Sequence, residues 1–272
     1  MTEQIKQRQP LIELKDVTKT YHDGKRKDVF AVSNFNLTLY EGETLGLVGE
    51  SGCGKSTIGN MLVHLFTPDE GSILFRGQDI ASMNERQFHP LRKEIQMVFQ
   101  DPYSSLNPRK KIGWLLEEPL KIHRKNMKKE ERKAKVEEIL KEVGLDAEYA
   151  NRYPKELSGG QRQALTLLMA TLKKPRLLLL DEHTAALDPK TAAKVLSITE
   201  ELVAEGNLTT MMVTHNMKDA ITIGNRLIMM NNGIIYDVSG EEKKNLTVED
   251  LLKKFSEASG EELVNDRMML AK

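Results

Sequence analysis

The chain has 272 residues and no net charge, because 40 lysine and arginine residues balance 40 aspartate and glutamate residues. This length favours one large domain or a domain with an inserted subdomain. The neutral balance gives no support for nonspecific nucleic-acid binding. A single cysteine excludes an internal disulfide framework and is typical of a reducing compartment. We expect no signal peptide and no membrane-spanning helix, because no apolar run is long enough for either.

The first hundred residues alternate between strand and helix patterns. Residues 11–21 and 30–40 alternate apolar with polar side chains, which predicts antiparallel strands with one face in water. Residues 44–49 form a short apolar run that ends in glycine, and the apolar residues of 58–66 recur at helical spacing. We therefore expect a strand, a glycine-rich loop and a helix in direct succession. A further buried strand is expected at 95–99.

The middle of the chain is predicted to be a helical insertion. Strand patterns stop between residues 101 and 154, and the stretch "KKEERKAKVEEILKEVGL" places its apolar residues on one helical face. Its basic residues are interleaved with acidic ones, which predicts a solvated helix face rather than a lipid contact. Residues 177–180 and 209–214 then read as buried parallel strands. A hairpin turning at 231–233 and a surface helix with a Thr-x-x-Asp start follow.

The stretch "GESGCGKST" fits the phosphate-loop pattern, and it stands between a predicted strand and a predicted helix. Such glycines let backbone N–H groups converge on phosphate oxygens at a helix start. We expect Lys55 to reach the β- and γ-phosphates of ATP, Ser56 to ligate Mg²⁺, and Thr57 to lie near the α-phosphate, as in related loops. A maleimide is expected to reach Cys53 when the loop is empty. The predicted nucleotide-binding residues here are Gly49, Glu50, Ser51, Gly52, Cys53, Gly54, Lys55, Ser56 and Thr57.

Four polar residues follow predicted strands at their carboxyl ends, where open α/β sheets bind ligands. Asp181 is expected to hold Mg²⁺ through a water, and Glu182 to polarise the attacking water. His215 is expected to donate a hydrogen bond to a γ-phosphate oxygen. Gln100 offers an amide to both Mg²⁺ and the attacking water. The predicted catalytic residues are thus Glu182, His215 and Gln100, and the predicted metal ligands are Ser56, Gln100 and Asp181.

The stretch "LSGGQRQ" predicts a second anion site at a helix start. Its serine and the amides that follow are suited to the γ-phosphate of ATP. An insertion that juts from the core would place them away from the chain's own phosphate loop. A two-fold dimer resolves this, because each such stretch can then face the loop of the other subunit. The residues of this second site are Ser158, Gly159, Gly160 and Gln161.

The motifs, in this order, resemble those of an ATP-binding cassette (ABC) ATPase over nearly the whole chain. The resemblance implies an α/β phosphate-loop NTPase fold with a RecA-like core, an antiparallel β subdomain and an inserted α-helical subdomain. It implies that Tyr21 stacks on adenine and that Asp188 is the aspartate of the family's D-loop. It also implies ATP-driven closure of a homodimer or a heterodimer with a second ABC ATPase. Two membrane permease subunits and a peripheral place on the cytoplasmic face of the plasma membrane are further implications.

We expect a single ABC domain over 1–272. Its core and β subdomain are predicted at 11–100 and 164–240, its helical insertion with the signature at 101–163, and a helical tail at 241–272.

The substrate is predicted from two resemblances. Residues 11–163 resemble the ATPases of oligopeptide and dipeptide importers, whereas residues 164–272 resemble a different importer-like branch, with His183 where proline is usual. The chain thus has the pattern of a mosaic, natural or engineered. Peptide import is favoured, because the peptide-importer type covers the region that grips membrane subunits. An amino-acid importer ATPase and a soluble cluster-assembly ATPase are the alternatives, and intact Glu182 and His215 argue against a module without turnover.

Overall fold

The computed structural model describes residues 9–21, 28–101, 105–123, 126–231 and 233–259. Within these ranges the chain forms two compact units, which are described separately below. The first unit comprises residues 1–97, 176–181 and 207–272, and the second comprises 98–175 and 182–206. The second unit therefore includes more of the chain than the predicted helical insertion at 101–163. Among the described residues, no helix has both the length and the apolar character needed to cross a membrane.

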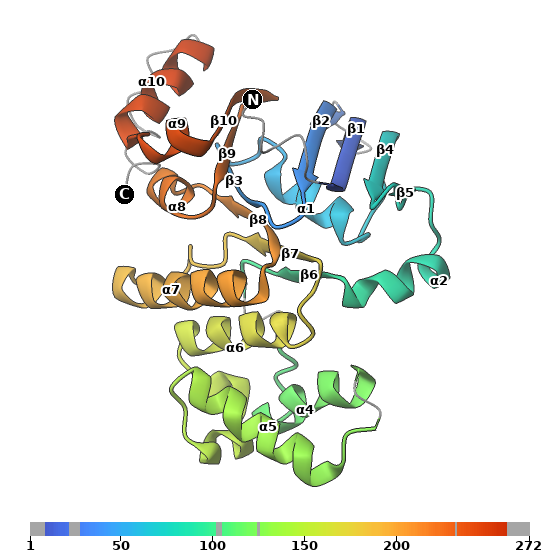
Figure 1. Ribbon diagram of the computed structural model, residues 1–272, viewed down its shortest axis with the longest axis vertical. Helices are drawn as coiled ribbons and strands as arrows, with labels where there is room; N and C mark the ends of the chain where they lie inside the picture. The colour runs from blue at the N-terminus through green and yellow to red at the C-terminus, as the bar shows by residue number, and fades with distance from the viewer. Residues whose placement is uncertain (1–8, 22–27, 102–104, 124–125, 232, 260–272) are drawn as a thin grey trace. The chain divides into compact units, whose positions relative to one another are not determined.

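The first unit begins with an antiparallel sheet whose strands are ordered β2-β1-β4-β5 (Figure 1). The strands are β1 Pro10–Tyr21, β2 Val29–Tyr40, β4 Glu70–Phe75 and β5 Gln78–Asp79. Leu14 of β1 lies opposite Leu37 of β2 and Ile73 of β4, and all three side chains are buried. The predicted strands at 11–21 and 30–40 are thus confirmed, including their antiparallel pairing.

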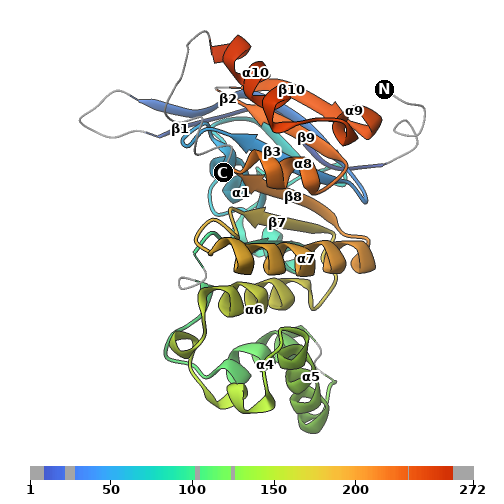
Figure 2. The ribbon, with the colours of Figure 1, turned by 90° about the vertical axis from the view of Figure 1, so that its left-hand side faces the viewer.

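The second sheet of this unit has six strands in the order β10-β9-β3-β8-β7-β6 (Figure 1; β10 to β7 are also labelled in Figure 2). Its strands are β3 Thr44–Gly49, β6 Ile95–Val98, β7 Leu177–Asp181, β8 Thr209–Thr214, β9 Arg226–Met230 and β10 Ile234–Ser239. β3 pairs in parallel with β8 and β9, and β7 pairs in parallel with β8. The residues of β3, β7 and β8 are buried throughout, as expected for parallel strands covered on both faces. The predicted buried strands are confirmed, and the predicted hairpin forms from β9 and β10, although Asn232 lies outside the described residues.

Helix α1, Lys55–Leu62, begins directly after the phosphate loop, so the predicted succession of strand, loop and helix is confirmed. The predicted bounds of 58–66 are wrong. His64 adopts a left-handed backbone with φ 58°, and the N–H of Leu65 donates to the carbonyl of Asn60 at 3.0 Å. This bond and the left-handed residue form the kind of C-terminal cap that stops a helix. Apolar residues at 65 and 66 continue the helical spacing, which is why the pattern overruns the helix.

The remaining helices of the first unit follow β5, β8 or β10 in the chain. They are α2 Glu85–Phe88, η2 His89–Lys93, α8 Met217–Thr222, α9 Gly240–Lys244 and α10 Val248–Ser259. The amide of Asp250 donates to Thr247 Oγ1, and the amide of Thr247 donates to Asp250 Oδ2, so the predicted Thr-x-x-Asp start of the surface helix is confirmed. Leu251 and Phe255 bury one face of α10 against β10 and α8. The predicted tail continues to residue 272, and its residues 260–272 lie outside the described residues.

The second unit is helical and has its own apolar cluster. Its helices are α4 Ile112–His123, α5 Lys129–Glu142, η3 Ala147–Asn151, η4 Pro154–Glu156, α6 Gly159–Thr171 and α7 Pro189–Gly206. α6 and α7 lie side by side in both views (Figures 1 and 2). Leu165 and Leu168 of α6 pack with buried side chains of α4 and α5, and Ile198 of α7 packs against the same cluster. Within residues 164–172, Ala164, Leu165 and Leu168 are buried in this cluster, and Met169 and Leu172 pack against it.

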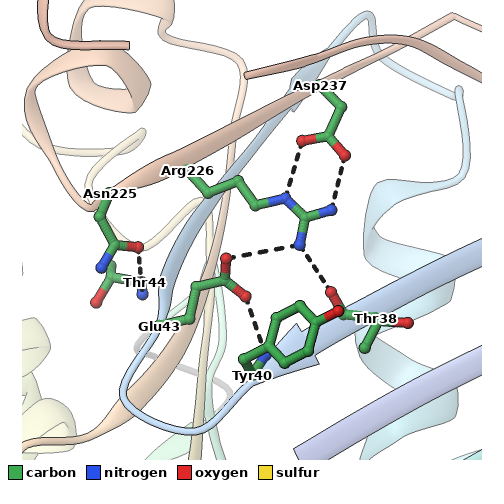
Figure 3. A network of polar contacts seen from close by, with 7 residues as sticks. All are labelled: Thr38, Tyr40, Glu43, Thr44, Asn225, Arg226 and Asp237. Atoms are coloured by element: carbon green, nitrogen blue, oxygen red, sulfur yellow. Dashed lines mark hydrogen bonds and ion pairs between the residues drawn. The ribbon is translucent and has the colours of Figure 1, made fainter. Parts of the chain in front are cut away.

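A partly buried arginine joins three segments of the first unit (Figure 3). Arg226, at the start of β9, donates through Nε and Nη2 to both carboxylate oxygens of Asp237 on β10, at 2.8 and 2.7 Å. Its Nη1 donates to the carbonyl of Thr38 on β2 at 2.7 Å and lies 3.6 Å from Glu43 Oε1. Burial alone would lower the pKa of Arg226, but hydrogen bonds to Asp237 and the charge of Glu43 raise it. The guanidinium therefore stays charged and joins the edge of the six-stranded sheet to the antiparallel sheet.

We expect Arg226→Met to lower the free energy of unfolding by about 3 kcal/mol, because it leaves the buried Glu43 carboxylate without its cation. Arg92→Met is the matched control, since Arg92 forms a bidentate salt bridge with Glu85 on the exposed surface. Chemical denaturation of both variants measures the difference. If Arg226→Met proved no more destabilising than Arg92→Met, the network would not be a major support of the fold.

Candidate functional site

The phosphate loop lies between β3 and α1 in the first unit, and two of its glycines are required by close packing. A Cβ built on Gly49 would lie 2.3 Å from the carbonyl oxygen of Met230 on β9. A Cβ on Gly54 would lie 2.2 Å from the carbonyl oxygen of Ala31, and Gly54 also has φ 95°, which L side chains rarely adopt. Gly54 is the N-cap of α1 and provides no side-chain cap. The first amides of α1 therefore keep the arrangement that suits an anion.

Lys55 turns its ammonium group back into the loop. Its Nζ donates to the carbonyl of Gly49 at 2.8 Å and to that of Glu50 at 2.6 Å, and it lies 3.6 Å from Cys53 Sγ. The side chain is 4% exposed, so the positive charge is held in a fixed position. Two of the three ammonium protons serve strong carbonyl acceptors, and the third faces only a weak sulfur acceptor. That donor is the one most easily turned toward a stronger acceptor.

Cys53 is less accessible than the sequence suggests. Its side chain is buried, with 8% of its surface exposed, and it packs in the apolar cluster of the first unit. The expectation that a maleimide reaches this sulfur through the loop is wrong for the described conformation, because the side chain turns inward toward Gly49 and Lys55.

Ser56 and Asp181 are brought together from positions 125 residues apart. Ser56 is the second residue of α1, and its hydroxyl donates to Asp181 Oδ1 at the end of β7, at 3.0 Å. The Asp181 side chain is buried. A hydroxyl and a carboxylate side by side are oxygen ligands of the kind that Mg²⁺ prefers. The donor set therefore fits the predicted metal, although the described residues contain no cluster of three or more His, Cys, Asp or Glu side chains suited to a metal.

The first unit also contains Tyr21 and His215. Tyr21 ends β1 with 43% of its surface exposed, and its ring meets that of Phe66 edge-on, with centroids 6.0 Å apart. The exposed ring thus has a supported edge and an open surface suited to stacking. His215 directly follows β8. The N-cap of α8 is the next residue, Asn216. Burial raises the pKa of the half-buried Asp219 on α8, and the charge of Lys218 partly offsets this rise.

The second unit joins two of the predicted catalytic residues. Gln100 Nε2 donates to Glu182 Oε2 at 3.0 Å, although 82 residues separate them. Glu182 has a left-handed backbone with φ 44°, which is uncommon for a residue with a side chain and is a form of strain often found at functional positions. The residue before Gln100 is also held in place, because Gln163 Nε2 of α6 donates to the carbonyl of Phe99 at 3.2 Å.

The residue after Glu182 is anchored as well. His183 is buried, and its Nε2 lies 3.1 Å from Thr199 Oγ1 on α7. The Thr199 hydroxyl donates to the carbonyl of Val195 at 2.9 Å, so the ring nitrogen is the donor toward the threonine oxygen. Burial lowers the pKa of His183 to about 4, which makes the ring neutral near pH 7. The sequence did not predict the structural roles of Thr199 and Gln163. Its one indication was the histidine at position 183, for which the sequence pattern suggested no hydrogen-bond partner.

The signature stretch forms the start of α6. Ser158 is the N-cap: its Oγ accepts from the amide of Gln161 at 3.2 Å, and Gln161 Oε1 accepts from the amide of Ser158 at 2.8 Å. A Cβ on Gly160 would lie 2.0 Å from Cγ2 of Thr191, so only glycine lets α6 approach α7 here. Asp188 caps α7 by accepting from the amide of Thr191 at 3.1 Å, and this bonding lowers its pKa. The Ser158 hydroxyl and the first amides of α6 keep their suitability for an anion.

Comparisons with known proteins agree with this architecture. The sequence profile of the family described as ABC transporter matches residues 32–185. The oligopeptide transport ATP-binding protein AppF of Bacillus subtilis (strain 168) is 42% identical over 86% of this chain and 73% of its own. The dipeptide transport ATP-binding protein DppF of Lactococcus lactis subsp. cremoris is 38% identical over 86% of this chain and 75% of its own. Since the alignment with AppF spans 240 residues, the similarity reaches well beyond residues 11–163.

Solved structures show the same fold. A dimeric structure of the ATP-binding cassette MJ0796 in a post-hydrolysis state, bound to ADP and Pi, has a TM-score of 0.74 at 32% identity, covering 84% of this chain and 98% of that one. Another dimeric structure of MJ0796, described as a bacterial ABC transporter cassette, has a TM-score of 0.75 at the same identity and coverage. The predicted fold class is confirmed by these structures and by the family profile, and the chain belongs to the ABC transporter family as one of its ATP-binding cassettes.

Proposed function

We propose that the chain is the ATP-hydrolysing subunit of an ABC importer and that it drives the uptake of peptides. The observation that carries the ATPase part is the hydrogen bond between Ser56 and Asp181, which joins the phosphate loop to the end of β7. The names of AppF, DppF and other relatives at 37–42% identity, all transport ATP-binding proteins for oligopeptides or dipeptides, support peptides as the substrate class. An amino-acid importer remains the alternative, because residues 164–272 resemble another importer branch.

The residues of the first unit are proposed to bind the nucleotide. Tyr21 stacks on the adenine ring, and the loop from Gly49 to Thr57 surrounds the phosphates with backbone amides. Lys55 donates to the β- and γ-phosphates from its fixed position. Ser56 and Asp181 hold Mg²⁺, which when bound neutralises charge that develops on the phosphate oxygens.

The hydrolytic step is proposed to use three further side chains. Glu182 accepts a hydrogen bond from the attacking water and orients it, and Gln100 fixes the Glu182 carboxylate through their hydrogen bond. His215 donates to a γ-phosphate oxygen. Gln100 is also proposed to offer its side-chain amide to Mg²⁺, as the sequence predicts.

The working form is proposed to be a dimer with two membrane subunits. In it the signature residues Ser158 to Gln161 of one subunit complete the nucleotide site of the other, and Asp188 lies at this interface. The dimeric structures of MJ0796 support such an arrangement. The partner is a second copy or another ABC ATPase, and the complex is placed on the cytoplasmic face of the membrane. We propose that the chain has three functional parts. They are the core with the β subdomain at 11–100 and 164–240, the helical insertion at 101–163 and the helical tail at 241–272.

The substrate proposal is tested by reconstituting the chain with candidate permease pairs in vesicles and measuring ATP hydrolysis. Permeases of peptide importers should stimulate hydrolysis and support peptide uptake, whereas permeases of amino-acid importers should not. Stimulation by the amino-acid permeases alone would replace peptides with amino acids as the substrate class.

Lys55→Ala should abolish ATP binding or reduce hydrolysis by at least about a hundredfold, because the ammonium facing the phosphates is lost. Lys93→Ala is the control, since it removes an exposed lysine of η2 in the same unit. Fluorescent nucleotide titration and phosphate release measure the two effects. Near-normal ATP affinity and turnover in Lys55→Ala would refute the assignment of the phosphate loop.

Glu182→Gln should keep ATP binding and stop hydrolysis, because an amide accepts hydrogen from water much less strongly than a carboxylate. Its oxygen can still accept from Gln100 Nε2, so the local geometry is retained. The variant should therefore accumulate as an ATP-bound dimer, which gel filtration with ATP and Mg²⁺ detects. Glu200→Gln, on the exposed side of α7, is the control. A monomer with undiminished turnover would contradict the role of Glu182.

The shared site is tested by mixing a Lys55→Ala chain with a Ser158→Arg chain, each inactive alone. Loss of the Ser158 cap should cost only ~1 kcal/mol, so the second chain still folds. In the mixed dimer one site carries both changes and the other carries neither, and partial hydrolysis should return if one intact site suffices. Without recovery in proven mixed dimers, either both sites are required or the signature acts within its own chain.

A further inference from the structure

The turn that follows β7 carries Glu182. The next residue, His183, makes a buried contact with Thr199 of α7. His183 and Thr199 are 3% and 1% exposed, and the distance between His183 Nε2 and Thr199 Oγ1 is 3.1 Å. Both partners lie in the second unit.

The contact is directional because each partner has only one role open to it. The Thr199 hydroxyl proton goes to the Val195 carbonyl, so the threonine oxygen accepts and His183 Nε2–H donates. A buried N–H of this kind would lose about 1–3 kcal/mol without an acceptor, so the ring is strongly held in one orientation. The turn around it is short, since the amide of Ala185 donates to the carbonyl of Glu182 at 3.0 Å.

Glu182 needs such support because its backbone is strained. A left-handed φ of 44° persists only where neighbouring contacts fix it. Its side chain is fixed at one end by Gln100, 3.0 Å away, and its backbone is fixed through the adjacent His183. A turn released from α7 would let the carboxylate move, and a displacement near 1 Å is enough to slow a reaction about a hundredfold.

We propose that His183 and Thr199 are positioning residues for Glu182: their hydrogen bond fixes the turn after β7 on α7 and thereby orients the carboxylate toward the attacking water. This inference rests on the proposed function. Neither residue belongs to the phosphate loop, so we expect the pair to act on the hydrolytic step and not on ATP binding.

The principal variant is Thr199→Val, which keeps the shape of the side chain but removes the acceptor oxygen. We expect kcat for ATP hydrolysis to fall about tenfold while KM and ATP affinity stay within about twofold, because the loop that binds phosphate is unchanged. Thr199→Ser retains the hydroxyl and should restore most of the rate. Thr171→Val is the matched control, since Thr171 of α6 also donates to a carbonyl one turn earlier, that of Leu167.

A double variant separates positioning from stability. In His183→Leu with Thr199→Val, both partners become apolar, which should recover most of the melting temperature lost in Thr199→Val. The directional bond is still absent, so kcat should remain about tenfold low. If kcat instead rose together with the melting temperature, the pair would be only a packing element and the inference would be overturned.

Glu182→Gln is measured in parallel to keep the two claims apart. If Glu182→Gln stops hydrolysis while Thr199→Val and the double variant both keep the normal kcat, the positioning role fails and the proposed function stands. If Glu182→Gln itself retains hydrolysis, the proposed function fails first. A loss confined to KM in Thr199→Val would also overturn the inference, because it would place the effect on nucleotide binding.

Discussion

The hydrogen bond between Ser56 and Asp181 is the interaction around which the first unit is organised. It joins the first turn of α1 to the last residue of β7, which are far apart in the chain. A buried carboxylate is costly without polar partners, so β7 can end in aspartate only where another segment brings donors to it. The parallel pairing of β7 with β8 and of β8 with β3 sets the distance between these segments. The pairing of the strands therefore determines that Ser56, after the loop, can reach Asp181.

Most of the fold could be predicted, because its elements depend on local patterns. The alternation in residues 11–21, the buried run at 177–180 and the glycine-rich loop each specify an element without help from distant residues. The end of α1 could not be predicted, since a left-handed residue at His64 interrupts an apolar spacing that continues to 66. The orientation of Cys53 was also missed, because whether a loop side chain turns inward depends on what lies behind it.

The contacts that sequence reasoning missed join a helix to a residue that follows a strand. His183 was noticed only as a departure from a pattern, and Thr199 sixteen residues later gave no signal of its own. Gln163 reads as part of the signature helix, yet its amide is used to hold the carbonyl of Phe99. Such pairs depend on how α6 and α7 pack against the preceding turns. The apolar periodicity of one segment does not show which side chain of another segment will contact it.

The close approach at Gly160 also restricts how this chain can change during evolution. The methyl group of Thr191 occupies the space that any side chain at position 160 would need. A side chain at 160 therefore requires Thr191 to turn its methyl group away or to be replaced by a smaller residue. The space available at the start of α6 is thus set by the size and orientation of one side chain on the neighbouring helix α7.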